Sequence, residues 1–539
     1  MLVPNRPMRF SIARWISSAS LGDISFVLAS FAGFLLLIAG LGALGFGLGF
    51  NIGPLGEDYN WIDMLQRGPG AQAARLLWAL DHRNPLSPWW YIAVRDFILR
   101  FDAALLVLRY AMAAVLAFSS YILVMVVAGP RARPFALALA VLILFWMANR
   151  YTEQIIWNFQ GALAASILSV AAYARFIAQE RRSYHLYAVS LLLWFFAFAT
   201  YTIQCGAAIA IGYLALRQAF SPTRDSVLDA RPSLVRRLGR AVLDVVPYVV
   251  LLGLFLLIWQ TTMGALADSI PLKFSAAALF RSLKQGVWNN DFAIFYDRLR
   301  SVTNPWVLIA AAVMSASVLF WALRWRQRGA VQTVPGLQWG TLVDVLIVFA
   351  SLALPTILLE SSSETWGPGT RWPIIYQVTT PAVSLVIIAA LVLSLSRTRQ
   401  GWASPLWNGA IALTAGIGAL FSLADNWVQN AIISNETFIH ENMQRLVAED
   451  LAAGRAAPKQ VLLRLEGPSR LWWRSFDIVS PVIARVWLRP LDTSFRLIPW
   501  SHLDAYAWWR IRFGPDSEGV SNAKVWGARF RIKTSTFFQ

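Results

Sequence analysis

The residues best suited to chemistry stand directly after the first long apolar run of the chain. Glu57 and Asp58 are adjacent acids, and Tyr59 follows them. A carboxylate at the boundary between membrane and water can act as a general base that takes the proton from an attacking hydroxyl. A plainer interpretation, in which the two acids only hydrate the end of a helix, explains these residues equally well.

More polar residues follow in the same loop, which covers residues 51–102. Asp81, His82 and Arg83 stand together, and segment 87–101 then alternates aromatic, apolar and charged residues at helical spacing. This segment is too polar to cross a bilayer, so it is predicted to lie as a helix in the plane of the membrane interface. Its charged residues are then expected to form a solvated face.

A second polar concentration lies between the third and fourth apolar runs. It begins with Arg150 and continues with Glu153, Trp157 and Gln160, the last three at spacings i, i+4 and i+7. These three side chains are predicted to share one helix face. Such a face at membrane depth is expected to line a polar cavity, although hydrogen bonding between helices is the alternative.

A third concentration surrounds Arg371, which follows the turn-forming residues Gly367, Pro368 and Gly369. An arginine held at a membrane boundary is suited to binding a phosphate with two parallel hydrogen bonds. On the outer side of a membrane, Arg371 would have no part in setting the topology, and this favours a functional role.

The elements that must position these residues are apolar helices. Hydrophobic residues make up 57% of the 539 residues and charged residues only 14%. The mean hydropathy is +0.52, and a soluble domain could not bury so much apolar surface. The chain is therefore predicted to be an all-α polytopic membrane protein with about eleven transmembrane helices, at 27–50, 103–128, 135–150, 156–176, 186–201, 203–218, 241–262, 305–323, 341–359, 374–396 and 405–424.

Clusters of arginine between these runs predict the orientation, because positively charged loops stay in the cytoplasm. The N-terminus is then cytoplasmic, and the loops 51–102, 263–304 and 360–373 and the tail 425–539 lie outside. This orientation requires a break near residues 200–204. A single helix over 186–218 would instead place the later basic loops on the outer side of the membrane. The net charge of +18 is largely this orientation signal, so nucleic acid is not expected as a partner.

The chain is expected to divide into a transmembrane domain, 1–424, and a small extracytoplasmic region of mixed structure, 425–539. In the latter, 436–452 is predicted as a helix and 460–466 as a strand. The first apolar run is expected to be a retained anchor rather than a cleaved signal. Cys205 is the only cysteine, which excludes a disulfide within the chain and a cysteine metal site, and the four histidines are scattered.

This layout resembles the GT-C superfamily of membrane glycosyltransferases. The acidic pair Glu57-Asp58 before Tyr59 is similar to the pair that these enzymes carry after their first span. The resemblance continues, in order along residues 27–396, in the following segments: Asp81-His82-Arg83, Glu153 with Trp157-Asn158-Phe159-Gln160, and Thr370-Arg371-Trp372. Glu57 stands where an aspartate is frequent, so the resemblance favours Asp58 as the base.

The resemblance implies an inverting transfer of a sugar from a polyprenyl-phosphate donor to a glycan, lipid or protein acceptor. The reaction would take place at the outer face of a bacterial inner membrane, among membrane lipids. Asp58, with Glu57, would deprotonate the acceptor, and Arg371, with His82 or Arg83, would hold the phosphate. Some members bind a divalent metal at the acidic pair, but nothing in this sequence requires a metal or another cofactor.

Three other functions remain open. The first is an O-antigen polymerase or ligase, although such enzymes favour a large late loop, whereas the long acidic loop here is the first. The second is a lipid or polysaccharide transporter, for which mid-span charges and an internal repeat would be typical. The third is a structural membrane subunit whose basic tail docks a partner.

Overall fold

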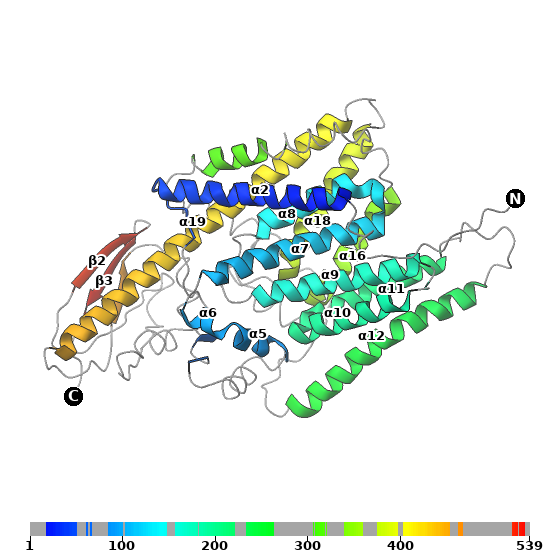
Figure 1. Cartoon of the computed structure of the whole chain (residues 1–539), viewed down its shortest axis with the longest axis horizontal. Helices are drawn as coiled ribbons and strands as arrows, with labels where there is room; N and C mark the ends of the chain where they lie inside the picture. Colours follow the sequence, from blue (N-terminus) through cyan, green and yellow to red (C-terminus); the bar gives the residue numbers. More distant parts are fainter. Residues whose placement is uncertain are drawn as a thin grey trace.

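A bundle of apolar helices makes up most of the described chain (Figure 1). The computed structural model describes residues 18–50, 61–62, 65–66, 85–100, 103–147, 157–179, 181, 183–220, 233–263, 306, 308–317, 320, 339–358, 374–396, 403–452, 462–466, 520–525 and 528–533. The helices are α2 (Ser18–Ala43), α5 (Ser87–Ala93), α6 (Arg95–Arg100), α7 (Ala104–Ala128), η1 (Pro130–Ala132), α8 (Arg133–Met147), α9 (Trp157–Ala178), α10 (Tyr184–Thr200), η2 (Thr202–Cys205), α11 (Gly206–Phe220), α12 (Leu234–Met263), α16 (Trp339–Leu358), α18 (Ile374–Ser396) and α19 (Ala403–Ala452).

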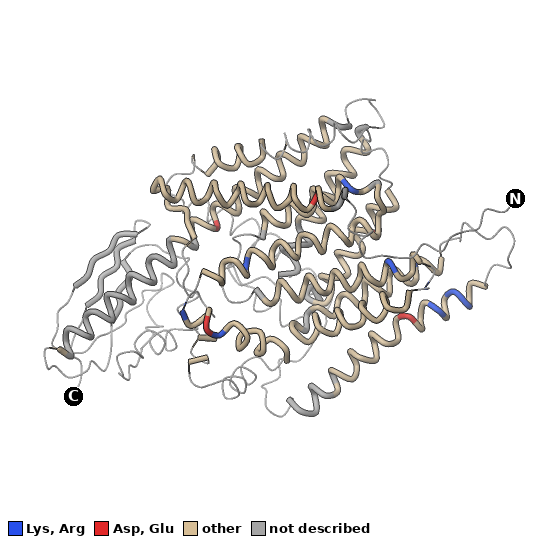
Figure 2. The backbone as a smooth tube through the Cα atoms, viewed as in Figure 1, with Lys and Arg blue, Asp and Glu red and all other residues tan. Residues whose placement is uncertain are grey.

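The helices have the composition of membrane spans. In the described part, five helices are long and apolar enough to cross a membrane: Leu21–Ala43, Ala104–Ala128, Asn158–Ala178, Leu234–Phe255 and Pro405–Trp427. Shorter apolar helices coincide with the other predicted spans: Arg133–Trp146, Tyr184–Thr200, Gly206–Phe220, Leu308–Ser317, Trp339–Pro355 and Pro381–Ser394. Charged residues are sparse along the described helices (Figure 2). The chain is thus a helical protein with membrane character.

The degree of burial orders the helices from the centre to the edge. The apolar window of α9 is 72% buried, whereas that of α12 is only 11% buried. α9 packs against α7, α10 and α11, and α12 lies at the edge of the bundle (Figure 1). Small residues allow close helix packing inside a membrane, and Ala136, Ala138 and Ala140 of α8 are at most 1% exposed. α12 therefore presents most of its apolar surface to the surroundings.

Two predicted local features are present. The break near residues 200–204 is confirmed, because α10 ends at Thr200 and α11 begins at Gly206. Cys205 therefore lies in the connecting turn η2 rather than within a span. Segment 87–101 is helical as predicted, but it forms two short helices, α5 and α6, separated at Val94.

The tail departs from the sequence prediction in one respect. The predicted helices 405–424 and 436–452 are parts of one continuous helix, α19, of 50 residues. The expected domain boundary between residues 424 and 425 falls inside this helix. Residues 428–452 extend about 37 Å beyond the apolar span Pro405–Trp427, and β2 packs beside this part of the chain (Figure 1).

A small antiparallel sheet accompanies the far part of α19. Its strands are β1 (Leu462–Glu466), β2 (Val520–Val525) and β3 (Ala528–Lys533), in the order β1-β3-β2. β1 confirms the strand predicted at 460–466. The pairing of Val525 with Ala528 leaves two residues between β2 and β3, which is the length of a tight hairpin connection.

The bundle has two ends, named here by what lies at each. At the α5 end, α2 and α10 end and α7 and α9 begin. The contacts that show this join Phe50 to Tyr110, Tyr91 to Asn158 and the Leu86 N–H to the Ala199 carbonyl. At the opposite end, called the ion-pair end, three clusters of Asp, Arg and Tyr side chains join the helices.

The first cluster joins α2, α7 and α8. Arg133 donates from Nε and Nη2 to the two carboxylate oxygens of Asp23, at 2.7 and 2.9 Å. The Tyr121 hydroxyl donates to the same carboxylate at 2.7 Å. The Asp23 side chain is only 2% exposed, so its charge depends on these two donors rather than on water.

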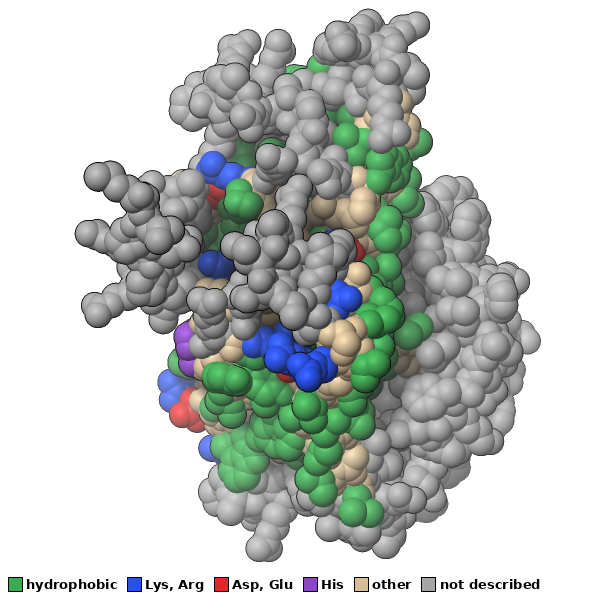
Figure 3. Space-filling view, turned by 90° about the vertical axis from the view of Figure 1, so that its right-hand side faces the viewer, with side chains coloured by type: hydrophobic (Ala, Val, Ile, Leu, Met, Phe, Trp, Pro, Cys, Tyr) green, Lys and Arg blue, Asp and Glu red, His purple; other side chains and the backbone are tan. Residues whose placement is uncertain are grey.

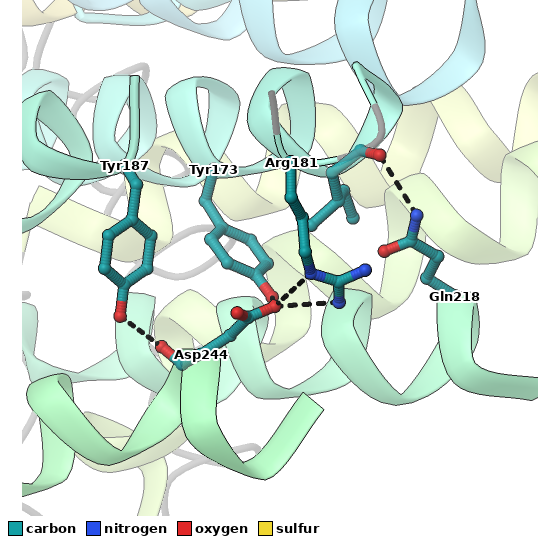
Figure 4. A network of polar contacts seen from close by, with 6 residues as sticks. Tyr173, Arg181, Tyr187, Gln218 and Asp244 are labelled. Carbon is teal, nitrogen blue, oxygen red and sulfur yellow. Dashed lines mark hydrogen bonds and ion pairs between the residues drawn. The ribbon is translucent and has the colours of Figure 1, made fainter. Parts of the chain in front are cut away.

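The second cluster ties α9, α10 and α12 together (Figure 4). Arg181 and Tyr173 donate to the Asp244 carboxylate at 2.9 and 3.1 Å, and the Tyr187 hydroxyl donates to the Asp244 backbone carbonyl at 2.7 Å. Close by, the Gln218 amide of α11 donates to the Ile177 carbonyl at 3.0 Å. One network thus links four helices.

The third cluster joins α11 to α16. Tyr213 donates to the Asp344 carboxylate at 2.6 Å, and Arg217 forms an ion pair with the same carboxylate. Arg133 and Arg181, which belong to the arginine clusters that predict the orientation, are therefore also ion-pair partners. The described face of this end carries arginine side chains beside apolar ones (Figure 3).

Replacing Arg133 with methionine should lower the free energy of unfolding by about 1–3 kcal/mol, because it leaves the buried Asp23 carboxylate with fewer donors. Arg240→Met, at an exposed position of α12, is the control and should have little effect. Thermal unfolding in detergent measures both. Equal midpoints for the two variants would show that the first cluster does not stabilise the bundle.

Candidate functional site

The chain leaves α2 through a turn rich in glycine, residues 44–50, which we call the glycine turn. Asn426 of α19 pairs with the peptide of Gly49 in both directions: its Nδ2 donates to the Gly49 carbonyl at 2.8 Å, and its Oδ1 accepts from the Gly49 N–H at 3.1 Å. Asn430, one turn further along α19, donates to the Gly47 carbonyl at 3.0 Å. Two asparagines therefore fix the point from which the first loop departs.

Glycine is required in this turn for two reasons. Gly45 and Gly47 have φ values of 79° and 76°, in the region that residues with a side chain rarely adopt. A Cβ on Gly47 would also lie 2.5 Å from Nε1 of Trp427. The turn thus lies directly against α19, and a larger residue at Gly47 would displace the Trp427 side chain.

Within the first loop, Trp61 packs on α5, and α5 in turn contacts the first turn of α9. The Trp61 ring stacks on Tyr91 of α5, with centroids 4.2 Å apart. The Tyr91 hydroxyl donates to Oδ1 of Asn158 at 3.4 Å, and Nδ2 of Asn158 donates to the Ser87 hydroxyl at 2.9 Å. Both Tyr91 and Asn158 are at most 2% exposed. These contacts place Trp61, α5 and the first turn of α9 in one buried polar and aromatic layer.

Two buried charged side chains lie at the same end of the bundle. Arg109, near the start of α7, is 3% exposed, and its guanidinium carbon is 6.0 Å from the centre of the Tyr110 ring. Asp425 of α19, also 3% exposed, directly precedes Asn426 of the glycine-turn contact. Ionisable residues inside membrane helices are costly and usually functional. Arg109 interrupts the apolar run 103–128 and Asp425 directly follows the run 405–424, and these positions were the sequence signal that could have identified them.

Most residues predicted for the site lie outside the described residues. These are Glu57, Asp58, Tyr59, Asp81, His82, Arg83, Arg150, Glu153 and Arg371. Trp157 is the first residue of α9. Gln160 is described fully: it is 1% exposed, and its Oε1 has no hydrogen-bond partner. This oxygen therefore forms no hydrogen bond to a neighbouring helix.

The arrangement at the α5 end suits the binding of a polar headgroup beside an apolar chain. A buried guanidinium can bind an anion, whereas a buried carboxylate and the Gln160 amide oxygen can accept hydrogen bonds from hydroxyl groups. Among the described residues, no three His, Cys, Asp or Glu side chains gather as they would around a metal. The acidic pair that the resemblance associates with a metal lies outside those residues.

Changing Asn426 to alanine should loosen the glycine turn. It removes two hydrogen bonds to Gly49, so the Gly49 amide should exchange with solvent about 10-fold faster or more, and the free energy of unfolding should fall by about 1–2 kcal/mol. Ser394→Ala, which removes an exposed bond within α18, serves as the control. Unchanged exchange at Gly49 in Asn426→Ala would show that α19 does not hold the turn.

No protein-family model, curated protein or solved structure matches this chain.

Proposed function

We propose that this chain is an inverting membrane glycosyltransferase that uses a polyprenyl-phosphate sugar. The observation that supports the proposal most is the assembly at the α5 end. There, α19 holds the exit of the first loop, and buried Arg109, Asp425 and Gln160 lie close to the same end of an otherwise apolar bundle. The polar residues at this end suit the polar headgroup of a lipid-linked donor, and the apolar helices suit its lipid chain.

The charge pattern and the resemblance support an orientation for the chain in its membrane. About eleven helices span a bacterial inner membrane, with the N-terminus and the ion-pair end in the cytoplasm. The α5 end and the tail 425–539 then lie outside. Positive-inside loops and the arginines of the ion-pair end support this orientation.

The proposed reaction is a single displacement. The acceptor hydroxyl gives its proton to Asp58, assisted by Glu57, and its oxygen forms a bond to the anomeric carbon. The bond from that carbon to the phosphate oxygen breaks, and its electron pair leaves with the polyprenyl phosphate. Arg371, with His82 or Arg83, stabilises the negative charge that develops on the phosphate. Attack opposite the leaving group inverts the anomeric carbon.

Buried Arg109 adds a second candidate for phosphate binding. It lies three residues before Met112, whose sulfur is 3.4 Å from where a Cβ of Gly161 would be. Gln160, the neighbour of Gly161, therefore lies at a height along the bundle similar to that of Arg109. Arg109 and Arg371 could bind the phosphate from the helix bundle and from the loop, respectively.

Spheroplasts supplied with a water-soluble, short-chain polyprenyl-phosphate sugar test this proposal. Label should enter an envelope acceptor only in cells that make the protein, because the reaction is proposed for the outer face. Label that enters equally without the protein would oppose the proposal. Donor that crosses the membrane unchanged would favour a transporter, and joining of preformed polysaccharide chains would favour an O-antigen polymerase or ligase.

The orientation can be tested separately with a cysteine introduced at Ser517, after Cys205 has been replaced. This cysteine should react with an impermeant thiol reagent in intact spheroplasts, because the tail is proposed to lie outside. A cysteine introduced at Arg236, in a proposed cytoplasmic segment, should react only after lysis. The reverse pattern would place the α5 end in the cytoplasm and contradict the proposed side of the reaction.

A further inference from the structure

The connection between α10 and α11 is an irregular segment at the α5 end of the bundle. Thr200 ends α10, Tyr201 is extended with φ −151° and ψ 103°, and η2 then leads to Gly206. The N–H of Leu86, just before α5, donates to the Ala199 carbonyl at 3.0 Å. In membrane proteins, irregular backbone between spans is tolerated where protein covers it or where it lines a polar space.

Polar atoms without partners gather at this connection. Gln204 and Thr200 are fully buried, and neither amide atom of Gln204 nor the hydroxyl of Thr200 has a hydrogen-bond partner in the structure. Buried amides are ordinarily satisfied, because an unmet group retains the full cost of losing its water. A side chain with no partner in the protein is therefore available to a ligand or to water.

Neighbouring helices fix this connection and bring Gln160 near it. The Tyr201 ring stacks on Phe159, with centroids 4.3 Å apart and planes 18° apart, and Gln160 is the next residue of α9. On the other side, Gly206 lies against α16 so closely that a Cβ would be 2.5 Å from the Leu352 carbonyl oxygen. The unmet groups are therefore held on rigid elements, as a specific binding site requires.

We propose that Gln204, Thr200 and Gln160 form a subsite for the sugar hydroxyls of the lipid-linked donor. This inference rests on the proposed function, because it assigns one part of the same substrate. A hydroxyl both donates and accepts hydrogen bonds, and it therefore matches an amide that offers an NH₂ group and a carbonyl oxygen. A phosphate could use only the donors and would leave the two amide oxygens unmet.

Because the Gln204 side chain has no hydrogen-bond partner in the protein, Gln204→Leu should weaken sugar binding without lowering the stability of the ligand-free protein. Leucine fills similar space without polar atoms, so the ligand-free protein should be as stable as the wild type or more stable. Only the affinity for the sugar-bearing lipid should fall. A residue that stabilises the fold through its own hydrogen bonds would behave in the opposite way.

Purified protein in detergent, titrated with polyprenyl phosphate and with polyprenyl-phosphate hexoses and pentoses, provides the test. Thermal-shift titration should show that the wild type binds at least one sugar-bearing lipid more tightly than the bare lipid. Gln204→Leu should lose this preference by about 10- to 100-fold while its unfolding midpoint without ligand does not fall. Gln218→Leu is the matched control: it removes a formed bond to Ile177, so it should lower the midpoint and keep the preference.

The outcomes separate the two proposals. A wild-type protein that binds no sugar-bearing lipid more tightly than polyprenyl phosphate would overturn the proposed donor and the subsite with it. A wild-type preference that persists in Gln204→Leu would overturn the subsite alone and leave the donor in place. A fall in the midpoint of Gln204→Leu as large as that of Gln218→Leu would assign Gln204 a structural role and would also overturn the subsite.

Discussion

Replacing Asp58 with asparagine should lower the rate of sugar transfer by about 10²- to 10⁴-fold, the usual loss when a general base is removed. Asparagine keeps the shape of the side chain but cannot accept the acceptor proton. The proposed position of Asp58 at a hydrated boundary means that the unfolding midpoint should not change. Initial rates with a labelled polyprenyl-phosphate sugar, together with thermal unfolding, measure both effects.

Glu57→Gln provides the comparison within the acidic pair. A smaller loss than for Asp58→Asn is expected, because Glu57 is proposed only to assist the base. If neither variant changed the rate, the pair would have the plainer role of hydrating the end of a helix. The proposed base would then have to be found elsewhere at the α5 end, where Asp425 is a buried carboxylate among the described residues.

Gly206→Ala should destabilise the protein by about 1–3 kcal/mol or more, because the added methyl group meets backbone atoms that cannot rotate away. Its Cβ would lie 2.5 Å from the Leu352 carbonyl oxygen and 2.7 Å from that of Ser351. α11 and α16 would have to separate, and this would also disturb the η2 connection before Gly206. The expected result is a lower unfolding midpoint and a lower yield of folded protein.

Gly212, six residues further along α11, offers a matched control. Nothing lies within 4 Å of a Cβ added there, and alanine is favoured over glycine in a helix by roughly 0.5–1 kcal/mol. Gly212→Ala should therefore stabilise the protein slightly, so the two substitutions in one helix should have opposite signs. If Gly206→Ala were as stable as Gly212→Ala, α11 and α16 would not be packed this closely.

Features set by local composition could be predicted from the sequence. Apolar runs predict helices because backbone groups must be satisfied internally in lipid. The break near residues 200–204, the helical segment 87–101 and the strand at 460–466 followed from short polar interruptions and from alternation. The continuous α19 was missed because its polarity changes near residue 425, yet residues 425–452 contain no Gly or Pro to end the helix.

Features that depend on contacts between distant residues could not be predicted. Asn426 and Gly49 are 377 residues apart, and nothing in either local sequence indicates that they pair. The three Asp–Arg–Tyr clusters likewise need the packed bundle, since each carboxylate and its arginine come from different elements. Arg109, a charge within an apolar run, and Asp425, a charge directly after one, carried a sequence signal, but their common end of the bundle is evident only from the fold.

The bond between a sugar and polyprenyl phosphate is the bond that this protein is proposed to break. The most direct measurement uses purified protein in lipid nanodiscs, a panel of labelled polyprenyl-phosphate sugars and an envelope extract as the source of acceptor. The proposal predicts the release of free polyprenyl phosphate, together with labelled acceptor whose new bond has the inverted anomeric configuration, and no release with Asp58→Asn. Every donor remaining intact in the presence of folded wild-type protein and extract would contradict it.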